Sequence, residues 1–283
     1  MRTIKKIHYA ESVPFEGLRT NSPLQSPNTS PIDPFILLNH HGPQFYEPNN
    51  KGLPFGPHPH RGMETVTFII DGDLSHKDSA GHDSIIKSGG VQWMTAGSGV
   101  IHAEVSSEEF KRNGGNLEIL QLWLNLPAKL RMAKPFYKGL QKDEIPFQSE
   151  DEGRVIVKIV SGEWKNIRSV IESISGVSIF ILEMKSGGKL ETSVPVDHNI
   201  FFYVVNGKVV VNEHQSSEGE LVEFNHDSEN IFIECKSDSI ILFGHAKPFN
   251  ETIFAYGPFV MNTRQEIQQA YEDYQAGKFG NWV

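Results

Sequence analysis

The stretch GPHPHRGMETVTFIIDG, Gly56–Gly72, places two histidines one residue apart, directly before an apolar run typical of a buried strand. Side chains at positions i and i+2 of a strand point to the same face, so His58 and His60 are expected to share one. If the strand is regular, this register continues through Glu64, while Thr67 takes the opposite face. The sequence therefore predicts that both imidazoles face an apolar interior.

A second pair lies in WMTAGSGVIHAEV, Trp93–Val105, where His102 and Glu104 follow a glycine-rich turn and share a face. A single His-x-His pair is more often surface or turn chemistry than a metal site. Three imidazoles and a carboxylate, however, suit a divalent transition metal, and without a cation the buried carboxylate would be costly. The two pairs together predict one metal bound by His58, His60, His102 and Glu104.

Short β-branched and aromatic runs, separated by turn residues, fill Glu64–Asn125 and again Arg154–Gly244. Between them Pro127–Gly153 is more charged and is interrupted by Pro and Gly, which is typical of a linker. These patterns predict an all-β protein with two antiparallel β-domains, residues 1–135 and residues 136–283.

The two halves resemble each other around one glycine. The segments TVTFIIDGDL and FFYVVNGKVV superpose on Gly72 and Gly207, which suggests a duplicated β-domain. Asn206 and Gly207 both tolerate positive φ, so we expect a hairpin there.

The second half lacks the proposed ligands in this alignment. His58 falls on Ser193 and His60 on Pro195, while His198 is out of register by one residue. The sequence thus predicts a metal in the amino-terminal domain and none in the carboxyl-terminal domain.

The chain ends in a pattern typical of a helix. Thr263 and Glu266 have the spacing of a capping box, apolar residues follow at helical spacing from Ile267, and Gly277 is expected to end the helix. One amphipathic helix is therefore expected to close the carboxyl-terminal domain.

The 283 residues carry a formal net charge of −9, with no dense cluster of Lys and Arg, which argues against direct nucleic-acid binding. No apolar run reaches the length of a membrane span, and the amino terminus lacks a secretory signal. Cys235 is the single cysteine, which excludes an internal disulfide. These features predict a cytoplasmic protein, and the Pro-rich stretch before Asn50 predicts a loop-rich entry.

Several further side chains are weaker candidates. Glu64 is expected to support the site or the fold without binding the metal, and Arg61 to form a surface or interface ion pair. Of Gln92, Trp93 and Met94, whichever faces the metal lines the pocket, and Trp93 is expected in the core. Four histidines are expected in loops near the domain entrance: His40, His41, His76 and His82.

The two histidine motifs resemble the paired motifs of the pirin family, within the cupin superfamily. The segments DPFILLNHHGP, PFVMNTRQEI and AYEDYQAGKFG also resemble pirin segments, so the resemblance covers almost the whole chain. It implies a bicupin of two β-barrel domains, with one metal in the amino-terminal barrel. Iron(II) is the metal expected first, and the same four ligands accept manganese, nickel, copper or zinc.

The resemblance implies a metal-dependent dioxygenase that opens the ring of a flavonol such as quercetin, or of a similar small aromatic. Glu104 is then expected to act as the base that removes the proton of the 3-hydroxyl group. The implied partners are the small-molecule substrate and dioxygen, with the protein a monomer. The alternative is a non-enzymatic, iron-dependent redox sensor that binds a transcription regulator or a metabolic enzyme.

Overall fold

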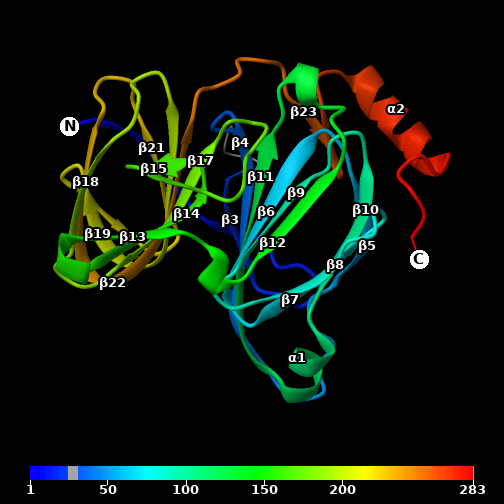
Figure 1. Ribbon diagram of the computed structural model, residues 1–283, viewed down its shortest axis with the longest axis horizontal. Helices are drawn as coiled ribbons and strands as arrows, with labels where there is room; N and C mark the ends of the chain where they lie inside the picture. The colour runs from blue at the N-terminus through cyan, green and yellow to red at the C-terminus, as the bar shows by residue number, and fades with distance from the viewer. Residues whose placement is uncertain (25–30, 283) are drawn as a thin grey trace. The chain divides into compact units, whose positions relative to one another are not determined.

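The computed structural model describes residues 1–24 and 31–282, and most of them lie in antiparallel β-strands (Figure 1). Residues 25–30, which belong to the predicted loop-rich entry, lie outside the described residues, as does residue 283. The chain forms two compact units. The first unit comprises Ser12–Asn21, Leu37–Glu144 and Asn250–Val283, and the second unit comprises Met1–Glu11, Ser22–Ile36 and Ile145–Phe249.

Two sheets carry the first half of the chain. A seven-stranded sheet has the order β12-β9-β6-β11-β4-β3-β2, and a four-stranded sheet has the order β5-β10-β7-β8. The bounds of the strands of the first sheet are β2 Glu11–Ser12, β3 Thr20–Leu24, β4 Phe35–Tyr46, β6 Met63–Asp71, β9 Val91–Thr95, β11 Gly115–Asn125 and β12 Phe136–Leu140. Those of the second sheet are β5 Phe55–His60, β7 Asp73–Asp78, β8 Asp83–Lys87 and β10 Val100–Val105.

The helices of this half are short. The helix α1 spans Glu108–Asn113, and the 3-10 turns η1 and η2 span Ala128–Leu130 and Lys142–Glu144. Buried apolar residues from both sheets pack together in one core cluster, with Leu74, Ile86, Leu117 and Ile119 among them.

A bend at Arg61 and Gly62 carries the chain from β5 in one sheet to β6 in the other. Gly62 has a φ of +81°, a left-handed conformation that favours glycine. The bend interrupts the alternation of side-chain faces predicted from His58. The evidence is Thr67, which was predicted to face away from the histidines. Thr67 donates a hydrogen bond (2.9 Å) to Glu104 of the four-stranded sheet. The predicted register of β6 is therefore wrong: Thr67 faces the histidine side, and Glu64 the opposite side.

The second unit is built around a nine-stranded sheet in which β22 is the longest strand. The main order is β1-β21-β19-β22-β17-β14-β13, with β18 paired to β22 and β20 paired to β19. The strands are β1 Ile4–Tyr9, β13 Phe147–Glu150, β14 Val155–Ser161, β17 Ser178–Met184, β18 Lys189–Ser193, β19 Asn199–Val211, β20 His214–Ser217, β21 Glu220–Phe224 and β22 Asn230–Ala246. A 3-10 turn, η3 (Asp151–Gly153), and a two-stranded ribbon, β15 Glu163–Trp164 with β16 Ile167–Arg168, complete the unit.

The expected hairpin at Asn206 and Gly207 is wrong, because β19 runs through both residues as one strand. The pairing with β22 shifts register there, and Gly207 has a φ of +86°. This is a bulge that bends a continuous strand. The chain reverses at Asn212 and Glu213 instead, both of which have positive φ.

The loop-rich entry predicted before Asn50 also differs from the structure. The described part of this region, beyond the first ten residues, contains β2, β3 and the twelve-residue β4. Pro43 lies inside β4, where a proline is tolerated only if its missing N–H is not needed for pairing. Proline content alone therefore overestimated the loops.

The ends of the chain depart from the predicted division at residues 135 and 136. The strand β1 pairs with β21 in the second unit, although it was predicted in the amino-terminal domain. The strands β23 (Phe254–Tyr256) and β24 (Phe259–Met261) lie in the first unit with the helix α2 (Arg264–Gln275), red in Figure 1. The helix has the predicted capping box between Thr263 and Glu266, but it packs against β23 and β24 and closes the first unit.

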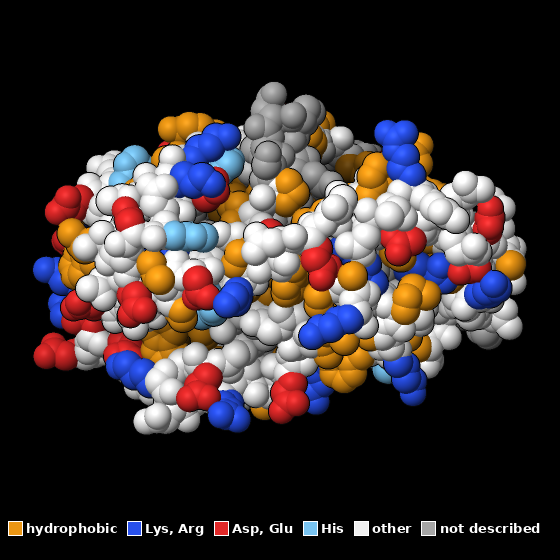
Figure 2. Space-filling view, turned by 90° about the horizontal axis from the view of Figure 1, so that it is seen from above, with side chains coloured by type: hydrophobic (Ala, Val, Ile, Leu, Met, Phe, Trp, Pro, Cys, Tyr) orange, Lys and Arg blue, Asp and Glu red, His pale blue; other side chains and the backbone are white. Residues whose placement is uncertain are grey.

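Acidic and basic side chains lie interspersed on the face shown in Figure 2. Neither described helix is long and apolar enough to cross a membrane.

Candidate metal centre

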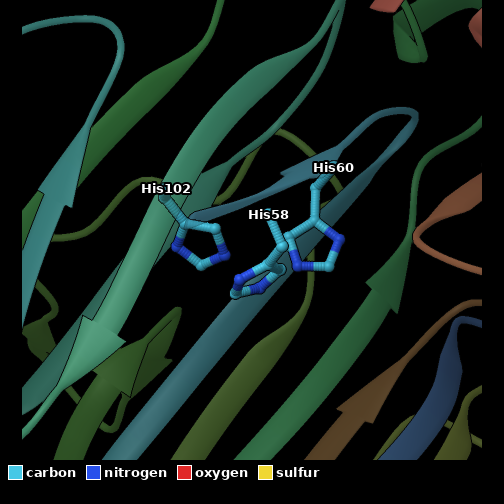
Figure 3. A group of neighbouring side chains, drawn as sticks. All are labelled: His58, His60 and His102. Atoms are coloured by element: carbon cyan, nitrogen blue, oxygen red, sulfur yellow. The ribbon is translucent and has the colours of Figure 1, made fainter. Parts of the chain in front are cut away.

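Three histidines converge from two neighbouring strands of the four-stranded sheet (Figure 3). His58 and His60 lie on β5, and His102 lies on β10 directly opposite His58. One nitrogen atom of each imidazole lies within 4.8 Å of the corresponding atoms of the other two. The structure thus brings together three of the four predicted ligands.

Backbone carbonyl groups orient two of these imidazoles. Nδ1 of His58 donates to the carbonyl oxygen of Gly56 (2.7 Å), and Nδ1 of His60 donates to that of Pro258 (3.0 Å). In these tautomers Nε2 keeps its lone pair, as a metal ligand requires. Pro258 belongs to the carboxyl-terminal segment, so that segment orients a residue of the histidine cluster.

His102 is fully buried, and neither of its ring nitrogens has a hydrogen-bond partner among the described residues. Burial lowers the pKa of His102 well below 6.5 and that of His60 to about 3. Both imidazoles are therefore neutral at pH 7 and offer lone pairs. A buried ring with two unused nitrogens fits a bound metal ion, because an unpaired buried polar group is otherwise costly.

Glu104 lies two residues beyond His102 on β10 and is 1 % exposed. It is not a member of the 4.8 Å histidine group, so its role as the fourth ligand stays a prediction. Its Oε1 accepts hydrogen bonds from Thr67 (2.9 Å) and Gln92, and its Oε2 accepts one from Gln121 (2.5 Å). These neutral donors stabilise the carboxylate without cancelling its charge.

Next to His102 lies a second polar group, on β7 and the turn after it. Nε2 of His76 donates to Asp78 (3.0 Å), and Asp78 also accepts from His82 (2.8 Å). Burial opposes ionisation, but these hydrogen bonds lower the pKa of Asp78 to about 2. The ring of Tyr137 stacks on His76 at 4.0 Å. His76 was expected in a loop, but it lies fully buried in the strand β7.

Sequence reasoning placed some neighbours correctly and missed others. Trp93 lies in the core, as expected. Gln92, one of the three residues expected to line the pocket, faces Glu104. Gln121 and Tyr137 were missed. Gln121 is a polar residue inside the apolar run LEILQLWLNL, and that interruption was the available signal.

Glu64 has a role in the fold. It is fully buried, and its Oε1 accepts hydrogen bonds from Nε1 of Trp93 (3.0 Å) and Oγ1 of Thr95 (2.7 Å). It is not a member of the histidine group.

Arg61 forms an ion pair as expected, with Asp273 of α2 (2.8 Å), but it is 4 % exposed and does not lie at the surface. Two other expectations are wrong. His40 and His41 lie in β4 and not in a loop, and they bond Glu118 and Thr20 respectively (both 2.8 Å).

The second unit contains a pair of neighbouring histidines. Nδ1 of His198 lies 3.0 Å from Nδ1 of His245, a hydrogen-bonding distance. Nearby, His226 bonds Asn199 (3.0 Å). That this unit binds no metal stays a prediction.

Comparisons with known proteins agree with this architecture. The family model Pirin matches residues 17–124, and the model of the pirin C-terminal cupin domain matches residues 179–280. A Pseudomonas aeruginosa protein named "Putative quercetin 2,3-dioxygenase" is 35% identical over 248 residues, which cover 88% of this chain and 87% of that protein.

Two solved structures share the fold. A quercetin 2,3-dioxygenase from Acinetobacter baumannii is 33% identical, with a TM-score of 0.93 and full coverage of both chains. A bacterial pirin from Escherichia coli in complex with nickel(II) has a TM-score of 0.68 and covers 86% of this chain and 99% of that chain. Its identity of 18% supports the fold alone. With two cupin domains and relatives along nearly its whole length, the chain belongs to the pirin family of the cupin superfamily.

Proposed function

We propose that this protein is a metal-dependent dioxygenase that opens the ring of a flavonol such as quercetin, or of a similar small aromatic. The observation that carries the proposal is the buried histidine triad, with the carboxylate of Glu104 on the same strand as His102. The relatives named for quercetin 2,3-dioxygenase support the substrate class.

His58, His60 and His102 would hold the ion, and Glu104 would be its fourth ligand. Three neutral imidazoles and one carboxylate suit iron(II), and they also accept manganese, nickel, copper or zinc. When bound, the ion supplies Lewis acidity for the substrate hydroxyl group and a place for dioxygen to react.

The protein contributes a base and a dry environment. Glu104 accepts the proton of the 3-hydroxyl group, dioxygen adds to the heterocycle, carbon monoxide leaves, and the proton returns to the product. His60, His102 and Glu104 are 2 %, 0 % and 1 % exposed, so water is largely excluded from that side. His58 is half-buried, so we infer that the substrate approaches from its side.

The test is to load the protein with iron(II) and to follow the absorbance of quercetin in air. We expect oxygen-dependent loss of the flavonol band, with release of one carbon monoxide per quercetin. The His102→Ala variant should lose at least about a hundredfold in rate, because a ligand of the ion is removed.

The matched control is His214→Ala, which removes a histidine from the second unit. It should retain the rate of the unaltered protein. Turnover no faster than that of the His102→Ala variant, in iron-loaded protein, would contradict the dioxygenase proposal.

A further inference from the structure

We propose that Gln92 and Gln121 are positioning residues that leave Glu104 a single free lone pair, on Oε2, and so make it a one-oxygen ligand of the bound metal. The inference rests on the metal site of the proposed function. It does not depend on which substrate the protein uses, or on whether a reaction follows.

The donors form one row across three strands. In the seven-stranded sheet, Thr67 of β6 lies opposite Gln92 of β9 on one side and opposite Gln121 of β11 on the other. Residues paired across neighbouring strands point to the same face. All three side chains therefore meet the carboxylate of Glu104, which comes from β10 of the four-stranded sheet.

An ionised carboxylate has about four lone-pair sites, two on each oxygen. On Oε1, Thr67 (2.9 Å) and Gln92 occupy both sites, and on Oε2, Gln121 (2.5 Å) occupies one. One site remains, and it is on Oε2. Glu104 can thus bind a metal through one oxygen only, and the same lone pair must accept a proton when the carboxylate acts as a base.

Outer donors fix which end of each amide faces Glu104. A glutamine can present either its oxygen or its NH₂ group. The hydroxyl group of Tyr137 donates to Oε1 of Gln92, and Nε1 of Trp123 donates to Oε1 of Gln121 (both 3.4 Å). Both NH₂ groups therefore point at the carboxylate.

Trp123 links this row to the histidine cluster. Its ring packs edge-on against His60 at 5.2 Å. One side chain therefore contacts a predicted ligand and holds the amide that orients Glu104. Because the two amides are neutral, the full negative charge of the carboxylate stays available to the cation, as it would not beside Arg or Lys.

The test uses cobalt(II) as the spectroscopic probe, without substrate. Gln92→Leu and Gln121→Leu should each weaken cobalt binding by about 10- to 100-fold, the usual effect of losing such a partner. They should also change the visible absorption of the bound ion, which reports its coordination geometry. Gln215→Leu, on an exposed position of β20, is the control and should change neither.

A crystal structure of the cobalt-loaded unaltered protein provides a second measurement that needs no variant. We expect one bond to Glu104, through Oε2, with the contacts from Gln92 and Gln121 intact. Two-oxygen coordination, or folded variants with unchanged affinity and spectrum, would overturn the inference. Failure to turn over quercetin would count against the proposed function alone, since these measurements involve no substrate.

Discussion

At the scale of single residues, Gly62 decides how the histidine strand joins the rest of its unit. A Cβ at this position would lie 2.0 Å from the carbonyl oxygen of Val260, and φ is +81°. We therefore expect Gly62→Ala to lower the free energy of unfolding by about 3 kcal/mol, from backbone strain and a clash together. Thermal unfolding of the two proteins measures this, and weaker cobalt binding is expected because His60 is two residues away.

Gly81→Ala separates the two causes. Gly81 also has positive φ (+95°), but a Cβ there would meet nothing within 4 Å. Only the backbone strain applies to Gly81→Ala, so we expect it to lower the free energy of unfolding by about 1 kcal/mol. Equal losses at the two positions would show that the carbonyl of Val260 does not restrict Gly62.

The two pairs of candidate ligands were accessible from sequence because each depends on local geometry. His58 and His60 share a face at spacing i, i+2, and so do His102 and Glu104 on their own strand. That the two strands lie side by side was expected because both pairs together suit one metal ion. The orientation of Thr67 was not accessible, because it depends on a bend between two sheets. The row formed with Gln92 and Gln121 requires the pairing of strands distant in sequence, which one chain does not reveal.

At the scale of elements, β1 is tied to β21 by a charged cluster that should make stability depend on pH. The hydrogen bond from His8 to Glu223 (2.9 Å) lowers the pKa of Glu223 to about 2. Burial raises this pKa, and the hydrogen bond and charge of Lys5 lower it further. Glu223 thus binds a proton less readily in the folded protein than in the unfolded chain, where its pKa is near 4.5. The stabilisation is complete above pH 4.5 and is lost as pH falls towards 2.

Urea unfolding of the protein and of Glu223→Gln measures this. The difference in the free energy of unfolding should be constant from about pH 7 to pH 5 and shrink from there to pH 3. Glu218→Gln, at an exposed position of the same unit, is the control and should vary less with pH. A difference that grows on acidification would contradict the assignment.

The strands themselves were largely predictable from β-branched and aromatic runs between turns, and the capping box of α2 from Thr263 and Glu266. The bulge at Gly207 was not. A glycine with positive φ serves a hairpin or a bulge equally well, and only the pairing of β19 with β22 distinguishes them.

At the scale of the whole molecule, the carboxyl-terminal segment belongs to the unit that holds the histidine triad. Pro258 orients His60, and the backbone N–H of Val260 donates to the carbonyl of Arg61 (3.1 Å). Deleting residues 250–283 should therefore abolish tight cobalt binding, although no predicted ligand is removed. Titration with cobalt(II) measures the effect.

Removing only residues 281–283 is the control and should leave cobalt binding within about twofold. If the protein without residues 250–283 still binds cobalt at full affinity, this segment does not support the site. The sequence could not predict this dependence, because hydrophobic pattern places a helix but not its packing partner.

This arrangement of the chain ends also sets an order for folding during synthesis. Domains generally fold as they leave the ribosome, amino-terminal first. Here β1 must wait for β21 (Glu220–Phe224), and the first unit must wait for β24 and α2, which are made after all the strands of the second unit. His60 therefore lacks its backbone partner, Pro258, until the chain has been made as far as residue 258. Until then the imidazole of His60 lacks the hydrogen bond that fixes its orientation, so the histidine triad is completed only after a segment almost two hundred residues later in the chain has folded back onto it.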